Sequence, residues 1–281
     1  MVSFRFWVGW SPSNPLTIEE SRQKDKGTVP GRGIDSAACA MARSRPRSRW
    51  AFRLLVAVLA AIALWAAWET VTWPDVARLA REQPKTTAFI DEYRARQRIL
   101  GKPARVAWTW TPYAAISPDV KRAVLVAEDI NFFSHRGFEL AELQNALEDA
   151  LRDRELPRGA STISQQLAKN LWLSPSRNPW RKAKEAILTW QMERALSKRR
   201  ILELYLNVVE LGPGLYGVSA ASQRYFGKPA SELGPAEAAQ LAAALPNPAV
   251  WHPGTESPAY RRRVASIRER MARAAFLGRQ F

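Results

Sequence analysis

The sequence predicts a mostly α-helical protein, in which one membrane-spanning helix precedes a compact helical domain. Three observations support this prediction. Residues 54–68 form an uncharged apolar run, and the chain after Pro74 is dominated by apolar residues at helical spacing. Only residues 106–110 (VAWTW) favour a short strand. A chain of 281 residues is also long enough to bury a sizeable core.

The apolar run continues to Trp73, which gives about 20 residues, enough to cross the hydrocarbon core of a bilayer. The arginines before it are Arg43, Arg45, Arg47, Arg49 and Arg53. Because arginine-rich flanks stay in the cytoplasm, we expect a cytoplasmic basic segment at 41–53, a single-pass signal anchor at 54–73, and residues 74–281 on the far side. A cleaved signal peptide is the alternative, but residues 69–73 (ETVTW) lack the small-x-small pattern of a cleavage site.

Residues 1–40 resemble neither a domain nor a targeting segment. They combine FRFWVGW with a polar stretch that contains Gly and Pro and shows no period. Met41 opens MARSRPRSRW, which would be a natural basic start for the anchor. We therefore expect residues 1–40 to be a non-native or dispensable extension.

Charge and residue counts limit the chemistry. Lys and Arg number 42 against 26 Asp and Glu, which gives a net charge of +16. This charge favours an anionic partner, namely nucleic acid, acidic lipid or a phosphorylated substrate, and composition does not choose among them. Cys39 is the only cysteine, so an intramolecular disulfide and a cysteine metal site are excluded. Since there are only two histidines, catalysis must rely on carboxylates, amides, hydroxyls and cations.

Helix-start signals recur after the anchor. They are Ser117-Pro118 before residues 119–129, Thr162-x-x-Gln165 as a capping box, and Asn178-Pro179. We expect the helix that begins at Pro179 to run without a break to Asn207. Further helices are expected at 217–225, 235–244 and 259–275.

Residues 127–137 (AEDINFFSHRG) contain the first candidate site. Glu128 and Asp129 end an apolar helical run, and both burial and the negative end of a helix raise the pKa of a carboxyl group. Such a group can act as a general acid or base near neutral pH. The plain alternative is a pair of solvated acids at a helix end, and His135 alone is more often a structural hydrogen-bonding group.

Residues 158–172 (RGASTISQQLAKNLW) contain the second. On a helix, Gln165, Lys169 and Trp172 share one face. Hydroxyls and amides at a helix start, followed one turn later by a lysine, can hold sugars and an anion. An ordinary capped surface helix explains the same residues.

Residues 177–185 (RNPWRKAKE) contain the third. Arg177, Arg181 and Lys182 cluster at a helix N-terminus, where the helix dipole is already positive and cations are unfavourable unless an anion binds. Glu185 lies one turn beyond Arg181 on the same face. The cluster predicts a phosphate or pyrophosphate site, and a solvated basic face is the alternative. Lys198, in contrast, is expected on a solvated face.

Residues 212–217 (GPGLYG) formally match the dinucleotide fingerprint G-x-G-x-x-G. That motif must follow a strand, whereas a helical run precedes this one. A turn that ends the helix is the better interpretation.

Taken together, the segments resemble the peptidoglycan glycosyltransferases. The resemblance rests on five stretches in order: Glu128-Asp129 with Phe132, His135 and Gly137; Gly159-x-Ser-Thr-Ile-x-Gln-Gln-Leu-x-Lys-Asn170; Arg181-Lys182-x-x-Glu185; Lys198-x-x-Ile201-Leu-x-x-Tyr205-Leu206-Asn207; and Gly217-x-x-x-Ala-x-x-x-Tyr225-Phe226. They cover about residues 118–250. Since the residues after them show no sign of a transpeptidase domain, we expect the chain to resemble the monofunctional proteobacterial type. Ser164 departs from the usual threonine but keeps the hydroxyl.

The resemblance implies a lysozyme-like fold and processive, inverting β-1,4 transfer that polymerises lipid II into glycan strands. It makes Glu128 the base for the acceptor's 4-hydroxyl and places Glu185, the other catalytic carboxylate, at the donor's phosphosugar. Lys169, Arg177 and Arg181 would neutralise the polyprenyl pyrophosphate. The implied substrate-binding residues are Asp129, His135, Ser161, Thr162, Gln165, Gln166, Lys169, Asn170, Arg177, Arg181 and Lys182.

The resemblance also implies surroundings and partners. No cofactor is required, although a divalent cation, Mg²⁺ or Mn²⁺, assists some members, and the sequence shows no dedicated metal cage. The implied location is the bacterial inner membrane, with the N-terminus cytoplasmic and the catalytic domain periplasmic. Expected partners are lipid II, the growing lipid-linked strand, the membrane, and cell-division or penicillin-binding proteins, but not nucleic acid.

Two other functions fit parts of the pattern. A lytic transglycosylase or lysozyme would share the fold, but it has no phosphate leaving group and does not need the cations at 177–182. A catalytically inactive cell-wall scaffold would be expected to lack its carboxylates, whereas Glu128 and Glu185 are both present.

Overall fold

The computed structural model describes residues 47–138, 161–175 and 178–281. Two compact units, residues 1–64 and 65–281, make up the chain. The expected extension at 1–40 lies outside the described residues, as do Arg43, Arg45 and Arg177. The mostly helical fold with one N-terminal candidate membrane helix is confirmed.

The helices are α1 (Arg47–Val71), α2 (Ala88–Ile99), α3 (Pro118–Glu128), α5 (Ile163–Trp172), α6 (Pro179–Ala195), α7 (Lys198–Val208), α8 (Val218–Phe226), α9 (Pro235–Ala244) and α10 (Pro258–Arg273). Short 3₁₀ turns are found at Ala77–Ala80, Tyr113–Ala115, Ala230–Glu232 and Ala275–Arg279. In the part of the chain that the structure describes, α1 is the one helix long and apolar enough to cross a membrane, over Arg49–Val71.

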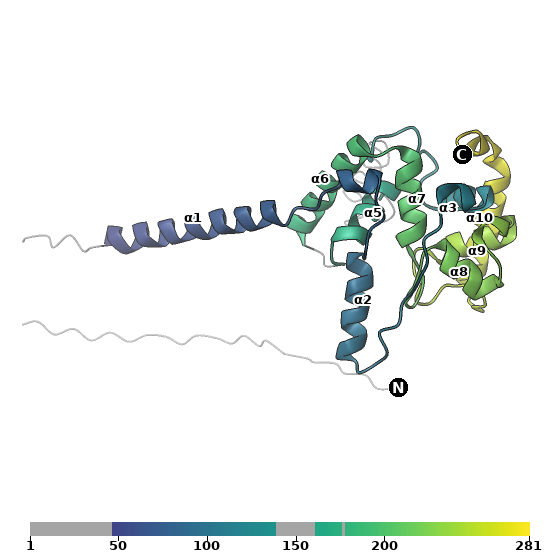
Figure 1. Ribbon diagram of the computed structural model, residues 1–281, viewed down its shortest axis with the longest axis horizontal. Coiled ribbons are helices and arrows are strands. Elements are labelled where there is room, and N and C mark those ends of the chain that lie inside the picture. Colours follow the sequence, from purple (N-terminus) through teal and green to yellow (C-terminus); the bar gives the residue numbers. More distant parts are fainter. Residues whose placement is uncertain (1–46, 139–160, 176–177) are drawn as a thin grey trace, which may run out of the picture. The chain divides into compact units, whose positions relative to one another are not determined.

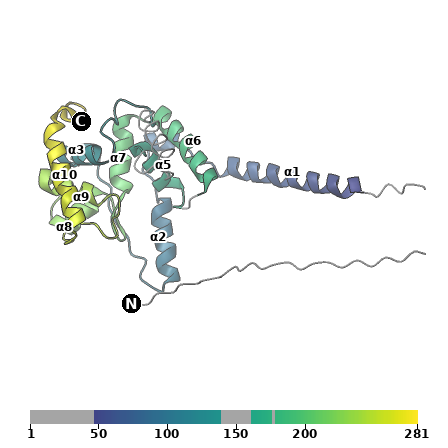
Figure 2. The ribbon, with the colours of Figure 1, turned by 180° about the vertical axis from the view of Figure 1, so that it is seen from behind.

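The helices of the second unit form two groups (Figures 1 and 2). Helices α2, α5, α6 and α7 lie together, with α5 in contact with each of the other three. Helices α3, α9 and α10 contact one another, and α8 contacts α9. One hydrophobic core joins the groups, since Val124 of α3, Leu167 of α5, Leu204 of α7 and Leu241 of α9 are all buried in it. Glu128, the last residue of α3, lies at the junction of the two groups of helices.

A small sheet connects the two groups. Strand β3 (Leu215–Tyr216) lies between β1 (Ala107–Trp108), which is parallel to it, and β2 (Glu210–Gly212), which is antiparallel. Strand β1 confirms the strand expected within 106–110. The β2–β3 hairpin was not predicted and occupies the segment interpreted as a turn.

The helix caps agree with the sequence. Ser117 caps α3, Thr162 and Gln165 form the capping box of α5, and Asn178 caps α6. Helices α8, α9 and α10 occupy the three expected segments to within two residues.

The prediction of one helix from Pro179 to Asn207 is wrong. Leu196 adopts an extended conformation, and the Ser197 hydroxyl accepts a hydrogen bond from the Arg200 N–H, which starts α7 as a new helix. The break lets Leu196 stay buried while α7 turns its own apolar face into the core. Helix α2 was also not predicted, because half of its residues are exposed and only Ile90 is buried, which leaves little apolar periodicity.

Candidate active site

Glu128 is held at the end of α3 by residues from two other helices. Its Oε2 accepts a hydrogen bond of 2.9 Å from Nε2 of Gln166 on α5, and its Oε1 pairs with Nη2 of Arg263 on α10 at 3.0 Å. One contact at each oxygen fixes the plane of the carboxylate. Arg263 was missed by sequence reasoning, since it lies 135 residues away from Glu128 in the chain.

Burial raises the pKa of Glu128. The hydrogen bond from Gln166 and the charge of Arg263 act in the opposite direction, because both favour the ionised form. The raised pKa of Glu128 agrees with the expectation drawn from the apolar run before it. A carboxyl group shifted this way is suited to exchange a proton near neutral pH.

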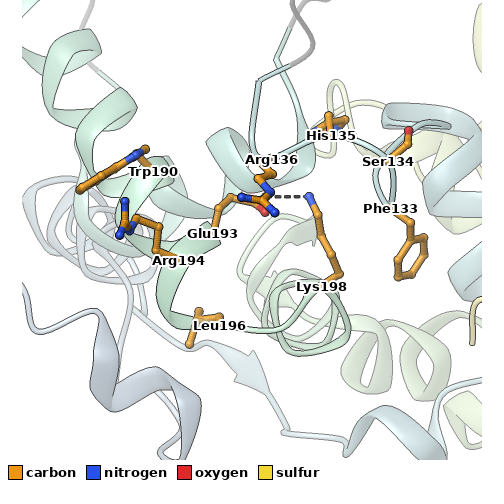
Figure 3. A pocket seen from close by; sticks show the side chains of 9 residues that line it. All are labelled: Phe133, Ser134, His135, Arg136, Trp190, Glu193, Arg194, Leu196 and Lys198. Atoms are coloured by element: carbon orange, nitrogen blue, oxygen red, sulfur yellow. Dashed lines mark hydrogen bonds and ion pairs between the residues drawn. The ribbon is translucent and has the colours of Figure 1, made fainter.

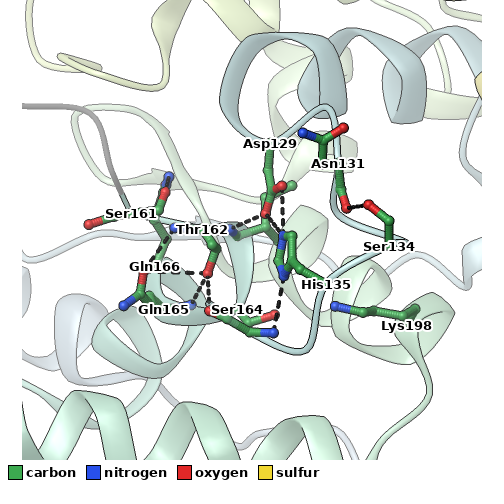
Figure 4. Close-up of polar contacts among 12 residues, drawn as sticks. Asp129, Asn131, Ser134, His135, Ser161, Thr162, Ser164, Gln165, Gln166 and Lys198 are labelled. Carbon is green, nitrogen blue, oxygen red and sulfur yellow. Dashed lines mark hydrogen bonds and ion pairs between the residues drawn. The ribbon is translucent and has the colours of Figure 1, made fainter. Parts of the chain in front are cut away.

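Asp129 has a different environment, which Figure 4 shows. Its carboxylate lies 2.9 Å from Nε2 of His135 and accepts the backbone N–H of Ile163, the first residue of α5, at 3.0 Å. Nδ1 of His135 accepts the N–H of Gly137, so Nε2 carries the proton that is donated to Asp129. An anion at a helix N-terminus is also stabilised by the helix dipole. Asp129 and His135 thus tie the loop after α3 to the start of α5.

The residues expected around the start of α5 mainly build that start. The Thr162 hydroxyl donates to the Gly137 carbonyl at 2.7 Å, and the Gln165 side chain accepts the Thr162 N–H at 3.0 Å. Ser164 donates to Glu193 of α6. Ser161 is exposed, whereas Asn170 is buried on α5. The structure therefore gives these residues a place at the start of α5, and their role in binding a sugar stays a prediction.

Glu185 is the second carboxylate. It is only 3% exposed, and its two oxygens bind Arg181, at 2.7 Å, and Lys182. The cations at the start of α6 therefore have an anionic partner inside the protein. Lys169 is within electrostatic range of the same carboxylate, so three cations face one anion and the described cluster keeps an excess of positive charge.

Lys169 is within electrostatic range of both carboxylates. Burial lowers the pKa of its amino group, while the charges of Glu185 and, more weakly, Glu128 oppose that shift. The positive charges of Arg181 and Lys182 lower the pKa of Lys169 further. Glu128 and the cation cluster thus belong to one site.

A hollow of about 620 Å³ lies beside His135. Figure 3 shows its lining, which includes Arg136, Trp190, Glu193 and Lys198. Lys198 pairs with Glu193 at 2.8 Å and lies over the Phe132 ring, and its side chain is 20% exposed. The expectation that Lys198 lies on a solvated face is therefore wrong, because its neighbours on α6 and in the loop after α3 cover it.

The described carboxylates do not fit a metal site. Across residues 47–138, 161–175 and 178–281, no three His, Cys, Asp or Glu side chains gather to hold an ion. Glu128 and Glu185 already bind cationic side chains, and Asp129 binds His135 and a backbone N–H.

A buried carboxylate beside a cluster of cations defines a site for acid–base chemistry on an anionic substrate. Residues 96–272 match the family model described as transglycosylase. The chain therefore belongs to the transglycosylase family.

The relatives are biosynthetic peptidoglycan transglycosylases. The chain is 51% identical to that of Azoarcus sp. (strain BH72) over 203 residues, which cover 71% of this chain and 85% of the relative. It is 40% identical to that of Laribacter hongkongensis, over 79% of this chain and 96% of the relative. It is 41% identical to that of Chromobacterium violaceum, over 80% and 97%.

Proposed function

We propose that the protein polymerises lipid II into linear peptidoglycan strands. In each cycle the acceptor's sugar 4-hydroxyl attacks the anomeric carbon of the lipid-linked donor strand. The new C–O bond forms with inversion as the bond to the pyrophosphate breaks. The names of the relatives and the family match support this reaction.

Glu128 is the base in this proposal. The attacking hydroxyl must lose its proton as the glycosidic bond forms, and a carboxylate within hydrogen-bonding reach can accept that proton. The environment of Glu128 is the single observation that carries the proposal. Burial raises its pKa, while Gln166 and Arg263 keep the ionised form accessible.

The cation cluster receives the leaving group. Arg181 and Lys182 bind Glu185, and Lys169 is within electrostatic range of it, in the described part of α5 and α6. Cations fixed in a partly dry site stabilise the charge that develops on a departing pyrophosphate. Arg177, outside the described residues, is assigned to the same group by the resemblance alone. Glu185 is placed at the donor's phosphosugar, where it also fixes Arg181 and Lys182.

The start of α6 also contacts the end of α1. Trp180 lies edge-on against Trp65 at 4.9 Å, and Lys184 pairs with Glu69 at 2.6 Å. Arg181 and Lys182 follow Trp180 directly, so the pyrophosphate site is next to the exit of the candidate membrane span. A substrate whose lipid remains in the bilayer presents its pyrophosphate at the membrane surface, which is where the span ends.

We further propose a single-pass inner-membrane protein with a cytoplasmic N-terminus and a periplasmic catalytic domain. Arg49 and Arg53 lie at the N-terminal end of the span, just before the uncharged run 54–68, which supports this orientation. A membrane-impermeant maleimide added to cells tests it in a Cys39→Ser background. Arg268→Cys should be labelled and Ser44→Cys should not, and the reverse pattern would contradict the orientation. Cell-division and penicillin-binding proteins stay predicted partners.

The full-length protein in detergent, given labelled lipid II, tests the function. We expect linear strands that lysozyme digests, and we expect moenomycin to block their formation. No polymer from a folded sample would contradict the proposal. Shortening of pre-formed strands without polymerisation would identify a lytic enzyme instead.

A further inference from the structure

Tyr205 on α7 reaches the base through one intermediate side chain. Tyr205 is fully buried, and its hydroxyl lies 2.8 Å from Oε1 of Gln166. Nε2 of the same amide lies 2.9 Å from Oε2 of Glu128 and 3.3 Å from the Ser161 carbonyl. A continuous line of hydrogen bonds therefore runs from the core of α7 to the carboxylate.

The two ends of an amide are not equivalent. Only the NH₂ end of Gln166 can donate to a carboxylate, and rotation by half a turn would place Oε1 against Glu128, oxygen facing oxygen. The Tyr205 hydroxyl donates its proton to Oε1. In the rotated amide the NH₂ group would face the phenol and could donate to its oxygen, but the phenol O–H would have lost its acceptor. Because a buried donor without an acceptor is costly, the phenol selects the productive orientation.

The phenol stays protonated in this place. Burial, together with the negative charges of Glu128 and Asp129, raises the pKa of Tyr205 well above its ordinary value. Tyr205 thus presents an O–H group to Gln166 over the whole range in which a carboxylate base would work.

We propose that Tyr205 is a positioning residue for the transfer reaction, which acts by locking the Gln166 amide so that its NH₂ group always faces Glu128. This inference rests on the proposed role of Glu128 as base. It also gives Gln166 a positioning role, in addition to the substrate contact predicted from the sequence.

The other groups around Glu128 do not replace this contact. Arg263 of α10 binds the opposite oxygen, Asp129 is the next residue in the chain, and Lys169 of α5 acts at longer range. Loss of the Gln166 bond would leave Oε2 without its donor. Since that bond lowers the pKa of Glu128 against the effect of burial, its loss should raise the pKa further.

Tyr205→Phe tests the proposal, because it removes one hydroxyl and keeps the ring. The acid limb of kcat/KM against pH should move to higher pH, since the base is then protonated over a wider range. A hydrogen bond to a charged group changes an equilibrium constant about tenfold or more. We therefore expect kcat/KM at the acidic end of the profile to fall about tenfold relative to its value at the optimum. Tyr216→Phe is the matched control: this buried hydroxyl donates to the Phe89 carbonyl at 3.3 Å, and its loss should leave the limb in place.

Gln166→Met provides an independent arm that leaves Tyr205 intact. It should move the acid limb of kcat/KM to higher pH as well. Adding Tyr205→Phe should cause no further shift, because the amide that joins Tyr205 to Glu128 is already absent. An unmoved limb in a folded Tyr205→Phe or Gln166→Met variant, or shifts that add, would overturn the proposal.

A titration without substrate separates this inference from the proposed function. Carbon-13 NMR of the Glu128 carboxyl, assigned by its loss in Glu128→Gln, should show the same upward movement in Tyr205→Phe and not in Tyr216→Phe. That result would support positioning even if no polymer forms from lipid II. If the enzyme polymerises lipid II but the pKa of Glu128 is the same in Tyr205→Phe as in the wild type, the positioning role is wrong and the proposed function stands.

Discussion

Lys169→Met should impair polymerisation far more than the loss of a cation from an exposed surface. Methionine keeps much of the aliphatic volume on α5 and removes the ammonium group. The matched control is Arg268→Met, because Arg268 is exposed on α10 and the change also removes one positive charge.

The expected magnitudes follow from the two environments. Lys169 is partly buried between Glu185, Arg181 and Lys182, and removing one preorganised group that stabilises transition-state charge costs about 10²–10³-fold in rate. A solvated charge about 8 Å from a phosphate contributes roughly 0.5 kcal/mol in water before screening, or about twofold. The structure therefore predicts a difference of at least about 50-fold between the variants.

Turnover of lipid II by the wild type and both variants, measured at low and high salt in one detergent, decides the matter. Salt should weaken general attraction of the substrate in all three proteins alike, and the gap between Lys169→Met and Arg268→Met should persist. Equal losses that disappear together as salt rises would refute the reasoning. The cluster would then serve only to attract anionic lipid.

Three further predictions concern stability. Because the pKa of Glu128 is raised in the folded state, the folded protein binds that proton more tightly than the unfolded chain, and ionisation of Glu128 destabilises it. Glu128→Gln should therefore melt at a higher temperature than the wild type above the folded pKa, with a difference that shrinks as pH falls toward the ordinary glutamate range; a lower Tm throughout would be inconsistent with the shift. Gly217→Ala should cost about 3 kcal/mol or more of the free energy of unfolding, since φ is +78° with ψ 152° and a Cβ would meet the Asn207 carbonyl oxygen at 2.5 Å. Gly227→Ala, at φ +68° in open space, should cost about 1 kcal/mol by urea denaturation, and equal costs would contradict the steric argument. Ser197→Ala should cost about 1 kcal/mol in the same assay, because it removes the cap that starts α7, and an unchanged midpoint would deny the cap that role.

Local signals predicted those parts of the fold that local chemistry determines. The caps at Ser117, Thr162 and Asn178 lie where hydroxyl and amide side chains precede apolar helical runs, and each satisfies N–H groups that the helix leaves free. The break at Leu196 was missed because neither Gly nor Pro marks it. The apolar spacing continues across the junction, and packing of both helices in the core, together with the Ser197 cap, favours the break.

The site was predictable in part. The ordered motifs brought Glu128, Glu185 and Lys169 to attention, and the structure places them in one electrostatic environment. The contacts that adjust Glu128 were not predictable, because Arg263 approaches from α10 and Tyr205 acts through an amide on α5. The exposure of Lys198 was misjudged for the same reason, since only the fold brings Glu193 and Phe132 against it.

The most direct test of the central claim, that Glu128 takes the proton from the attacking hydroxyl, is the polymerisation rate of Glu128→Gln at saturating lipid II. Glutamine keeps the size of the side chain and cannot accept that proton, and general base catalysis contributes about 10²–10⁴-fold. We expect the folded variant to retain binding of moenomycin and to lose polymerisation by at least about 10²-fold. A folded variant that retains more than roughly a tenth of wild-type turnover would show that Glu128 is not the base.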